Sequence, residues 1–204
     1  MVAAHRSLVY ALAFCSGFVV MALELLGGRI LAPFFGSSIY VWGSIITIFM
    51  LSLSLGYLAG GRLSLHSPNL TRFGVLFLAG AVGVVPVLLA ADPLMDAVFA
   101  RVEDPRYGSL LCSVLLFTLP TFLLGTISPY SVRLLVRLTE HSGQVAGMLY
   151  FASTLGSALG TLLTSFYFVL WFEMQTILLA MGGALVVGGV IAIVADRLLK
   201  PAAP

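Results

Sequence analysis

The sequence predicts an all-α, polytopic membrane protein in which six transmembrane helices form one bundle. Hydrophobic residues make up 60% of the 204 residues, charged residues make up only 9%, and the mean hydropathy is +1.11. A soluble domain of this size does not sustain such values. Six apolar stretches of about 20 residues, each long enough to cross a bilayer as a helix, follow one another along the chain. We therefore treat residues 1–204 as a single membrane domain.

The predicted spans cover residues 8–31, 40–63, 73–91, 107–135, 145–170 and 176–195. Since equally long apolar stretches follow the first, that stretch is not expected to be a cleaved signal peptide alone. Most connections are short. The longest, residues 92–106, alternates apolar and acidic positions near helical spacing and predicts a short helix in the membrane interface.

The basic residues favour the side of the bundle that holds both termini. That side carries Arg6, Arg62, Arg72, Arg133, Arg137, Arg197 and Lys200, and the other carries Arg29, Arg101 and Arg106. The positive-inside rule then puts both termini in the cytoplasm, and we expect a plasma membrane, the inner membrane of a bacterium. A net charge of +2 without a basic, aromatic-rich cluster indicates no nucleic-acid partner.

The first span carries a carboxylate, Glu24, followed by the pair Gly27 and Gly28, then Arg29 and Pro33. An ionisable group inside a bilayer costs about 2.5–3.5 kcal/mol, so it is expected to line a cavity or to pair with a partner. Glu24 is the main candidate for binding a solute. The alternatives are a structural ion pair for Glu24, and for Arg29 a side chain that extends to the interface.

Small residues recur every four positions along spans two and five, namely Ser52, Gly56 and Gly60, and Ala152, Gly156 and Gly160. Such faces let helix backbones approach closely, so we predict tight packing there. Residues 54–60 also match residues 154–160, and residues 80–82 match 182–184. The two halves, residues 8–91 and 107–195, then form a 3+3 inverted repeat, as in many secondary transporters. Chance similarity between Gly- and Leu-rich helices is the alternative.

The fourth span carries Pro120, Gly125 and Pro129. Each proline leaves a backbone carbonyl without its donor, which a membrane tolerates only where protein or a wet cavity satisfies it. Span four is therefore a predicted cavity wall. Gly27 and Gly28 interrupt span one at the matching place in its half, and such a pair of interruptions predicts a binding site at the midplane.

Catalytic, metal and cofactor sites are not expected. The histidines His5, His66 and His141 fall in connections or at the terminus, and both cysteines lie in apolar stretches. Glu24 is the one acid predicted at membrane depth, which excludes chemistry that needs two neighbouring carboxyl groups. We expect that the chain is not an enzyme.

Several motifs together resemble the membrane domain of the fused transporter/spermidine-synthase family. They are residues 24–37, 41–43, 56–62, 124–130 and 147–161. In that family a half-size bundle of the major facilitator superfamily (half-MFS) type is usually joined to a cytoplasmic aminopropyltransferase-like domain. The chain ends at Pro204 without such a domain, so the resemblance does not imply polyamine synthesis here. Residues 56–62 also lack the aspartate of the MFS signature.

The sequence leads to two functional hypotheses. In the first, the chain is half of a lipid-embedded MFS-type carrier that acts as a homodimer, and the resemblance implies polyamine-like cargo. Glu24 would hold a cationic group or a coupling proton, and Arg29 or Arg133 would pair with it. An ammonium group would meet the aromatic faces of Trp42, Tyr130 or Tyr150. In the second, the chain is a non-transporting anchor for a separate synthase-like enzyme.

Overall fold

The computed structural model describes residues 2–102, 104–136 and 142–199, and these ranges consist of helices with short connections and contain no strand. Six segments are long and apolar enough to cross a membrane: His5–Phe35, Ile39–Leu63, Leu70–Phe99, Pro105–Leu135, Ser142–Trp171 and Met174–Leu198. The prediction of an all-helical membrane protein with six spans is confirmed. Each span extends beyond its predicted limits at one end or both.

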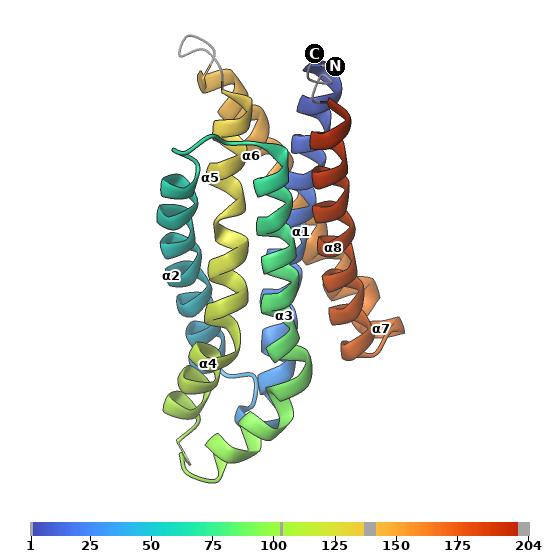
Figure 1. Ribbon diagram of the computed structural model, residues 1–204. Coiled ribbons are helices and arrows are strands. Elements are labelled where there is room, and N and C mark those ends of the chain that lie inside the picture. The colour runs from blue at the N-terminus through green and yellow to red at the C-terminus, as the bar shows by residue number, and fades with distance from the viewer. Residues whose placement is uncertain (1, 103, 137–141, 200–204) are drawn as a thin grey trace.

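Three spans are single helices at the start of the chain: α1 (Val2–Phe35), α2 (Ile39–Leu63) and α3 (Leu70–Phe99). Span four consists of α4 (Pro105–Gly125) and α5 (Ile127–Leu135). Span five consists of α6 (Ser142–Leu163), the π-helical turn η2 (Thr164–Phe168) and α7 (Val169–Trp171), and span six is α8 (Met174–Leu199). Figure 1 shows the start of α1 and the end of α8 next to each other at one end of the bundle.

Two local predictions from the sequence are wrong. Residues 92–106 do not hold a separate interfacial helix, because α3 continues through Pro93 to Phe99, and its last turns bend in Figure 1. Met95 and Val98 are buried against the bundle and hold this segment in α3. The first span is also not interrupted at its glycine pair, since α1 is one helix that ends two residues beyond Pro33.

The helices pack mainly in three pairs, α1 with α6, α2 with α4, and α3 with α8. In the α2/α4 pair, Gly56 and Gly60 face backbone. A Cβ on Gly56 would overlap the carbonyl oxygen of Phe122, and one on Gly60 would overlap that of Thr126. Only glycine permits this approach, because any side chain would displace the neighbouring backbone.

The α1/α6 pair repeats this arrangement. A Cβ on Gly156 would overlap the carbonyl oxygen of Phe14, and one on Gly160 would overlap that of Phe18. All four glycines selected from the sequence are buried. The small-residue faces of α2 and α6 therefore pack on α4 and α1, respectively.

The α3/α8 pair has a reciprocal contact. A Cβ on Gly74 would overlap the carbonyl oxygen of Gly189, and a Cβ on Gly189 would lie 2.8 Å from the carbonyl oxygen of Gly74. The sequence match between residues 80–82 and 182–184 has no counterpart here. A Cβ on Gly80 would meet Leu124, whereas nothing lies within 4 Å of one on Gly182.

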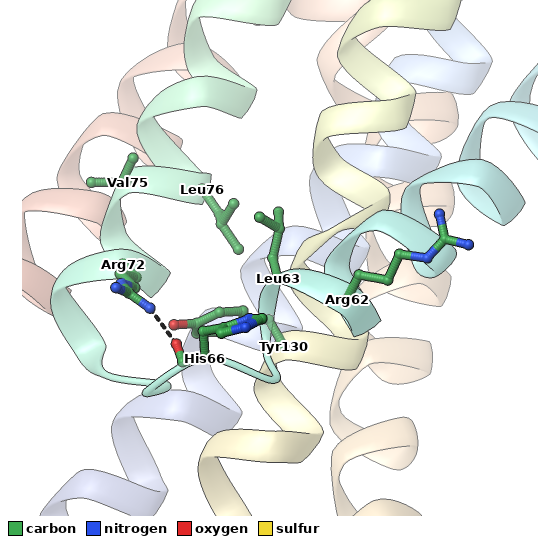
Figure 2. A pocket seen from close by; sticks show the side chains of 7 residues that line it. All are labelled: Arg62, Leu63, His66, Arg72, Val75, Leu76 and Tyr130. Carbon is green, nitrogen blue, oxygen red and sulfur yellow. Dashed lines mark hydrogen bonds between the residues drawn. The ribbon is translucent and has the colours of Figure 1, made fainter.

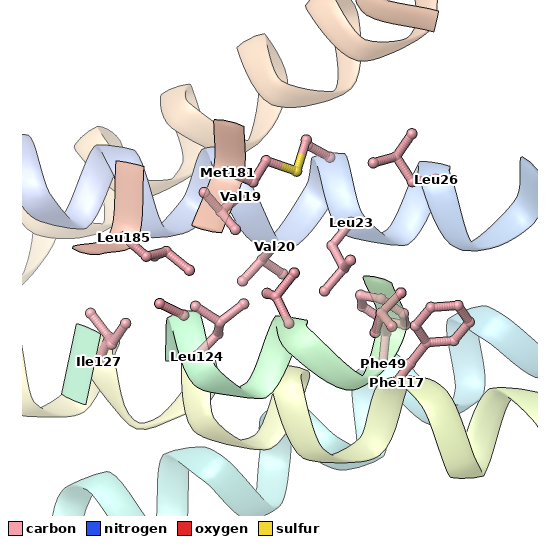
Figure 3. Close-up of a cluster of buried hydrophobic side chains, with 14 of the residues drawn as sticks. Val19, Val20, Leu23, Leu26, Phe49, Phe117, Leu124, Ile127, Met181 and Leu185 are labelled. Atoms are coloured by element: carbon pink, nitrogen blue, oxygen red, sulfur yellow. The ribbon is translucent and has the colours of Figure 1, made fainter. Parts of the chain in front are cut away.

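Buried apolar side chains fill the space between α1, α3, α4 and α8 (Figure 3). Phe49 of α2 and Phe117 of α4 form an aromatic pair with ring centroids 5.6 Å apart. Lipid is as apolar as these side chains, so dispersion in close packing, rather than a hydrophobic driving force, holds the helices together. The core thus depends on shape complementarity.

Asp104 caps α4 and makes its start sensitive to acid. The Asp104 carboxylate accepts hydrogen bonds from the backbone N–H of Arg106 at 2.9 Å and from its guanidinium at 2.8 Å. The side-chain hydrogen bond, followed by the backbone one, lowers the pKa of Asp104 below its ordinary value. A carboxylate with a lowered folded-state pKa contributes stability above its unfolded-state pKa and loses that contribution as pH falls through the folded-state pKa.

We therefore expect the wild-type melting temperature to fall more than that of Asp104→Asn between about pH 6 and about pH 3. The difference should be small, because the Asp104 side chain is 35% exposed and solvent screens its charge. Thermal melts of both proteins in the same detergent measure it. Equal falls would show that the cap does not contribute to acid sensitivity.

Candidate functional site

Glu24 lies half-buried on α1. Its side chain forms no ion pair and no hydrogen bond with any described residue. The structural ion pair considered from the sequence is therefore not formed with any of these residues. A carboxylate without a partner inside a membrane span is costly, and such groups generally mark a binding or proton-transfer site.

The glycine pair next to Glu24 makes room for two aromatic rings. A Cβ on Gly28 would lie 2.6 Å from the Cη2 atom of Trp42, and a Cβ on Gly27 would lie 3.1 Å from the Cζ atom of Phe117. Each glycine thus receives a ring from α2 or α4 and keeps its helical conformation. Trp42 contacts α1 one helical turn beyond Glu24, so these two predicted site residues lie close together along α1.

Arg29 follows on the same helix but is exposed. It makes no ion pair with Glu24 or with any other described residue. The structure therefore places Arg29 on the surface of the bundle, where its long side chain extends outward from α1. Glu24 and Trp42 are the better-placed members of this group.

Tyr130 lies in a different part of the bundle. Its phenol oxygen accepts a hydrogen bond from the Asn69 N–H at 3.3 Å and donates to the Asn69 carbonyl at 3.5 Å. Its ring stacks on Phe73 with centroids 5.9 Å apart and an interplanar angle of 7°. Tyr130 is fully buried and joins α5 to the start of α3, which is a structural role.

The remaining two predicted residues are on the surface. Arg133 in α5 is exposed, and Tyr150 in α6 is 57% exposed. Figure 1 shows α5 near the end of the bundle that holds the start of α1 and the end of α8. The six predicted binding residues therefore do not meet in one site within a single copy of the chain.

The predicted interruption of span four lies at Thr126, between α4 and α5. Pro129 has no N–H to donate to the Gly125 carbonyl four residues earlier. The Thr126 hydroxyl donates to the Leu123 carbonyl at 2.6 Å, and the Thr126 N–H donates to the same oxygen at 3.1 Å. Gly125 and Thr126 pack against the glycine face of α2. Protein therefore covers the backbone at this break.

Asp196 is a buried carboxylate that sequence reasoning missed. It is 8% exposed in α8, and its Oδ2 accepts a hydrogen bond from the Thr71 hydroxyl at 2.6 Å. Asp196 lies one residue beyond the predicted end of span six, so it is not among the acids expected at membrane depth. The sequence signal that could have identified Asp196 is its helical spacing from Leu185 and Ala192, which places the three residues on one face of the helix. Leu185 and Ala192 are fully buried in the structure.

We expect Thr71→Val to lower the free energy of unfolding by about 0.5–1.5 kcal/mol, because it removes a hydrogen bond to the buried Asp196 carboxyl group. Thr71→Ser keeps the hydroxyl and should retain most of the stability. Unfolding in detergent, followed by circular dichroism, measures both variants. Equal losses in the two variants would attribute the effect to the Thr71 methyl group instead of the hydrogen bond.

The described residues contain no group of three or more His, Cys, Asp or Glu side chains that could hold a metal ion. Two carboxyl groups in the helices are the features that we single out for functional chemistry: Glu24, without a partner among the described residues, and the buried Asp196, bonded to Thr71. Comparison of the chain with protein-family models, with curated proteins and with solved structures found no match in any of the three.

Proposed function

We propose that this protein is half of a secondary carrier of the half-MFS type, which moves a small cationic solute and works as a homodimer of two parallel copies in the bacterial inner membrane. Both termini lie in the cytoplasm in this arrangement, as the arginine distribution predicts. The observation that carries the proposal is that residues 8–91 and residues 107–195 make equivalent helix contacts. If each residue of one half is replaced by the matching residue of the other half, one helix contact becomes another, and we call this the exchange relation.

In this relation α2 matches α6 and α4 matches α1, so the α2/α4 pair corresponds to the α6/α1 pair. Glycines 56 and 60 correspond to glycines 156 and 160, and their backbone partners at positions 122 and 126 correspond to 14 and 18. A third contact follows the same rule, since Gly125 faces the carbonyl of Leu53 and Gly17 faces that of Ser153. These matching backbone contacts support an inverted repeat over chance similarity between Gly-rich helices.

The α3/α8 pair is the remaining main pair of the bundle. An axis that exchanges the halves would place α3 where α8 lies and α8 where α3 lies, so this pairing is compatible with the relation. Three helices related to the next three by such an axis form an inverted repeat. Secondary carriers of this architecture work by alternating access between two six-span units. One copy of the chain supplies only one such unit.

The exposed faces of α2 and α6 offer a surface on which a second copy of the chain could pack. The span formed by α6, η2 and α7 is the least buried of the six. Its exposed Tyr150 and Phe151 occupy positions equivalent to the exposed Met50 and Leu51 of α2. A symmetric dimer would bury the matching faces of α2 and α6 and enclose the site between the copies.

Glu24 supplies the chemistry of the proposed site. A carboxylate that forms no ion pair within the described residues can bind an ammonium group or carry a coupling proton. The ring of Trp42, one turn away, adds an aromatic surface for a cation. The resemblance to the transporter/spermidine-synthase family makes polyamines the first cargo to test and a synthase-like protein the first soluble partner.

The test is transport by the purified protein in proteoliposomes. We expect labelled spermidine or putrescine to cross the membrane in counterflow, and a pH gradient to change the rate if a proton is coupled. Empty liposomes and liposomes with heat-unfolded protein are the controls. If folded protein moved none of a panel of organic cations, the carrier proposal would fail and the anchor hypothesis would replace it.

A further inference from the structure

A cavity of about 410 Å³ opens at the end of the bundle that holds the start of α1 and the end of α8. It lies where α2 ends, α3 begins and α5 passes behind them (Figure 2). Its lining residues are Arg62, Leu63, His66, Arg72, Val75, Leu76 and Tyr130. The cavity has the size of a small-molecule site, and its residues are not those of the proposed transport site.

The polar part of the lining is basic. The Arg72 guanidinium donates to the backbone carbonyl of His66, which leaves most of its five donors for a ligand. Arg62 lines the cavity with the aliphatic part of its side chain. Figure 2 shows its guanidinium extending away from the other side chains. No carboxylate lines the cavity, and neither arginine makes an ion pair with a described residue. The Asp196 carboxyl group accepts a hydrogen bond from Thr71 and forms no ion pair with Arg62 or Arg72.

The rest of the lining is apolar. Leu63, Val75 and Leu76 form this wall, and Leu63 and Val75 are each about half exposed. The cavity therefore opens on the outer surface of the bundle, which faces lipid in a membrane. Arg72 also lies in the first turn of α3, where the helix dipole favours an anion.

We propose that this cavity binds the phosphodiester headgroup of an anionic phospholipid from the cytoplasmic leaflet. Arg72 would hold the phosphate, Arg62 would add positive charge beside the cavity, and the wall of Leu63, Val75 and Leu76 would contact the glycerol and upper acyl chain. A free phosphate ion has the same charge but would leave the apolar wall uncovered. Basic pockets between helices on this side of a membrane suit such headgroups. The site is independent of the proposed transport.

Native mass spectrometry of the full chain in detergent tests this proposal. The protein is titrated with phosphatidylglycerol or with phosphatidylcholine of the same acyl chains. We expect wild type to prefer phosphatidylglycerol and the double variant Arg62→Gln/Arg72→Gln to lose about ten- to thirtyfold in affinity for it. The matched control is Arg6→Gln/Arg197→Gln, which removes the same charge from exposed positions at the same end and should keep the preference.

A second variant tests the cavity without changing any charge. Val75→Trp fills the mouth from a half-exposed position, so it should keep the fold and lose the bound phosphatidylglycerol. Equal losses of phosphatidylglycerol affinity in the two double variants would overturn the proposal, because positive charge anywhere at this end of the bundle would then explain the binding without the cavity. Retention of lipid by Val75→Trp would overturn it as well. Displacement of the lipid by millimolar inorganic phosphate would assign the site to a free anion.

Discussion

Glu24→Gln is expected to lower transport of an organic cation by about ten- to a hundredfold, because it removes the charge that would bind the ammonium group or the proton. The same change should leave the fold intact. It removes an ionisable group from a membrane span, so the melting temperature should stay the same or rise. Counterflow in proteoliposomes and thermal melts in detergent measure the two effects on one preparation.

Two variants sharpen this result. Glu24→Asp keeps the charge and shortens the side chain by one methylene, so it should retain part of the activity. Glu173→Gln makes the same chemical change at an exposed acid between α7 and α8 and should transport normally. A Glu24→Gln protein that moved cations at the wild-type rate would remove Glu24 from the mechanism, even if the protein proved to be a carrier.

Gly60→Ala should destabilise the bundle by about 1–3 kcal/mol or more, whereas Gly61→Ala should stabilise it slightly. A Cβ on Gly60 would overlap the backbone of Thr126, and backbone in a packed helix pair cannot move aside. Nothing lies within 4 Å of a Cβ on Gly61, so alanine there only gains helix propensity, about 0.5–1 kcal/mol. Unfolding in detergent compares these neighbouring positions directly.

The exchange relation extends this prediction to the other half. Gly160→Ala should cost about as much as Gly60→Ala, because its Cβ would overlap the carbonyl oxygen of Phe18. Gly147→Ala, in open space on the same helix, is its control. A cost at Gly60 without one at Gly160 would contradict the equivalence of the two helix pairs and weaken the case for an inverted repeat.

Much of the fold could be predicted from local properties of the sequence. Apolar length defines the six spans, and four-residue spacing of small side chains selected the face of α2 that carries Gly56 and Gly60. The interruption of span four followed from Pro129, which lacks an N–H wherever it lies. The prediction of a break at Gly27 and Gly28 was wrong, because a glycine pair is compatible both with a broken helix and with a continuous helix that makes room for aromatic rings of neighbouring helices.

The candidate site could be predicted only in part. Glu24 stands out because a charge in an apolar helix is costly whatever surrounds it. Tyr130 was predicted as a binding residue, but its bond to Asn69 and its stacking on Phe73 could not be predicted, because they join residues far apart in sequence. Asp196 was missed for the same reason, since its partner Thr71 belongs to another helix.

The sequence by itself determined that this chain is a bundle of six membrane helices and that Glu24 carries an exceptional charge, because bilayer thickness and the cost of burying charge act on each segment separately. Only the tertiary structure decided which helices pair, which glycines meet backbone and which basic residues line a common cavity. Those features depend on contacts between helices distant in sequence, where lipid supplies no hydrophobic driving force and shape complementarity selects the partner.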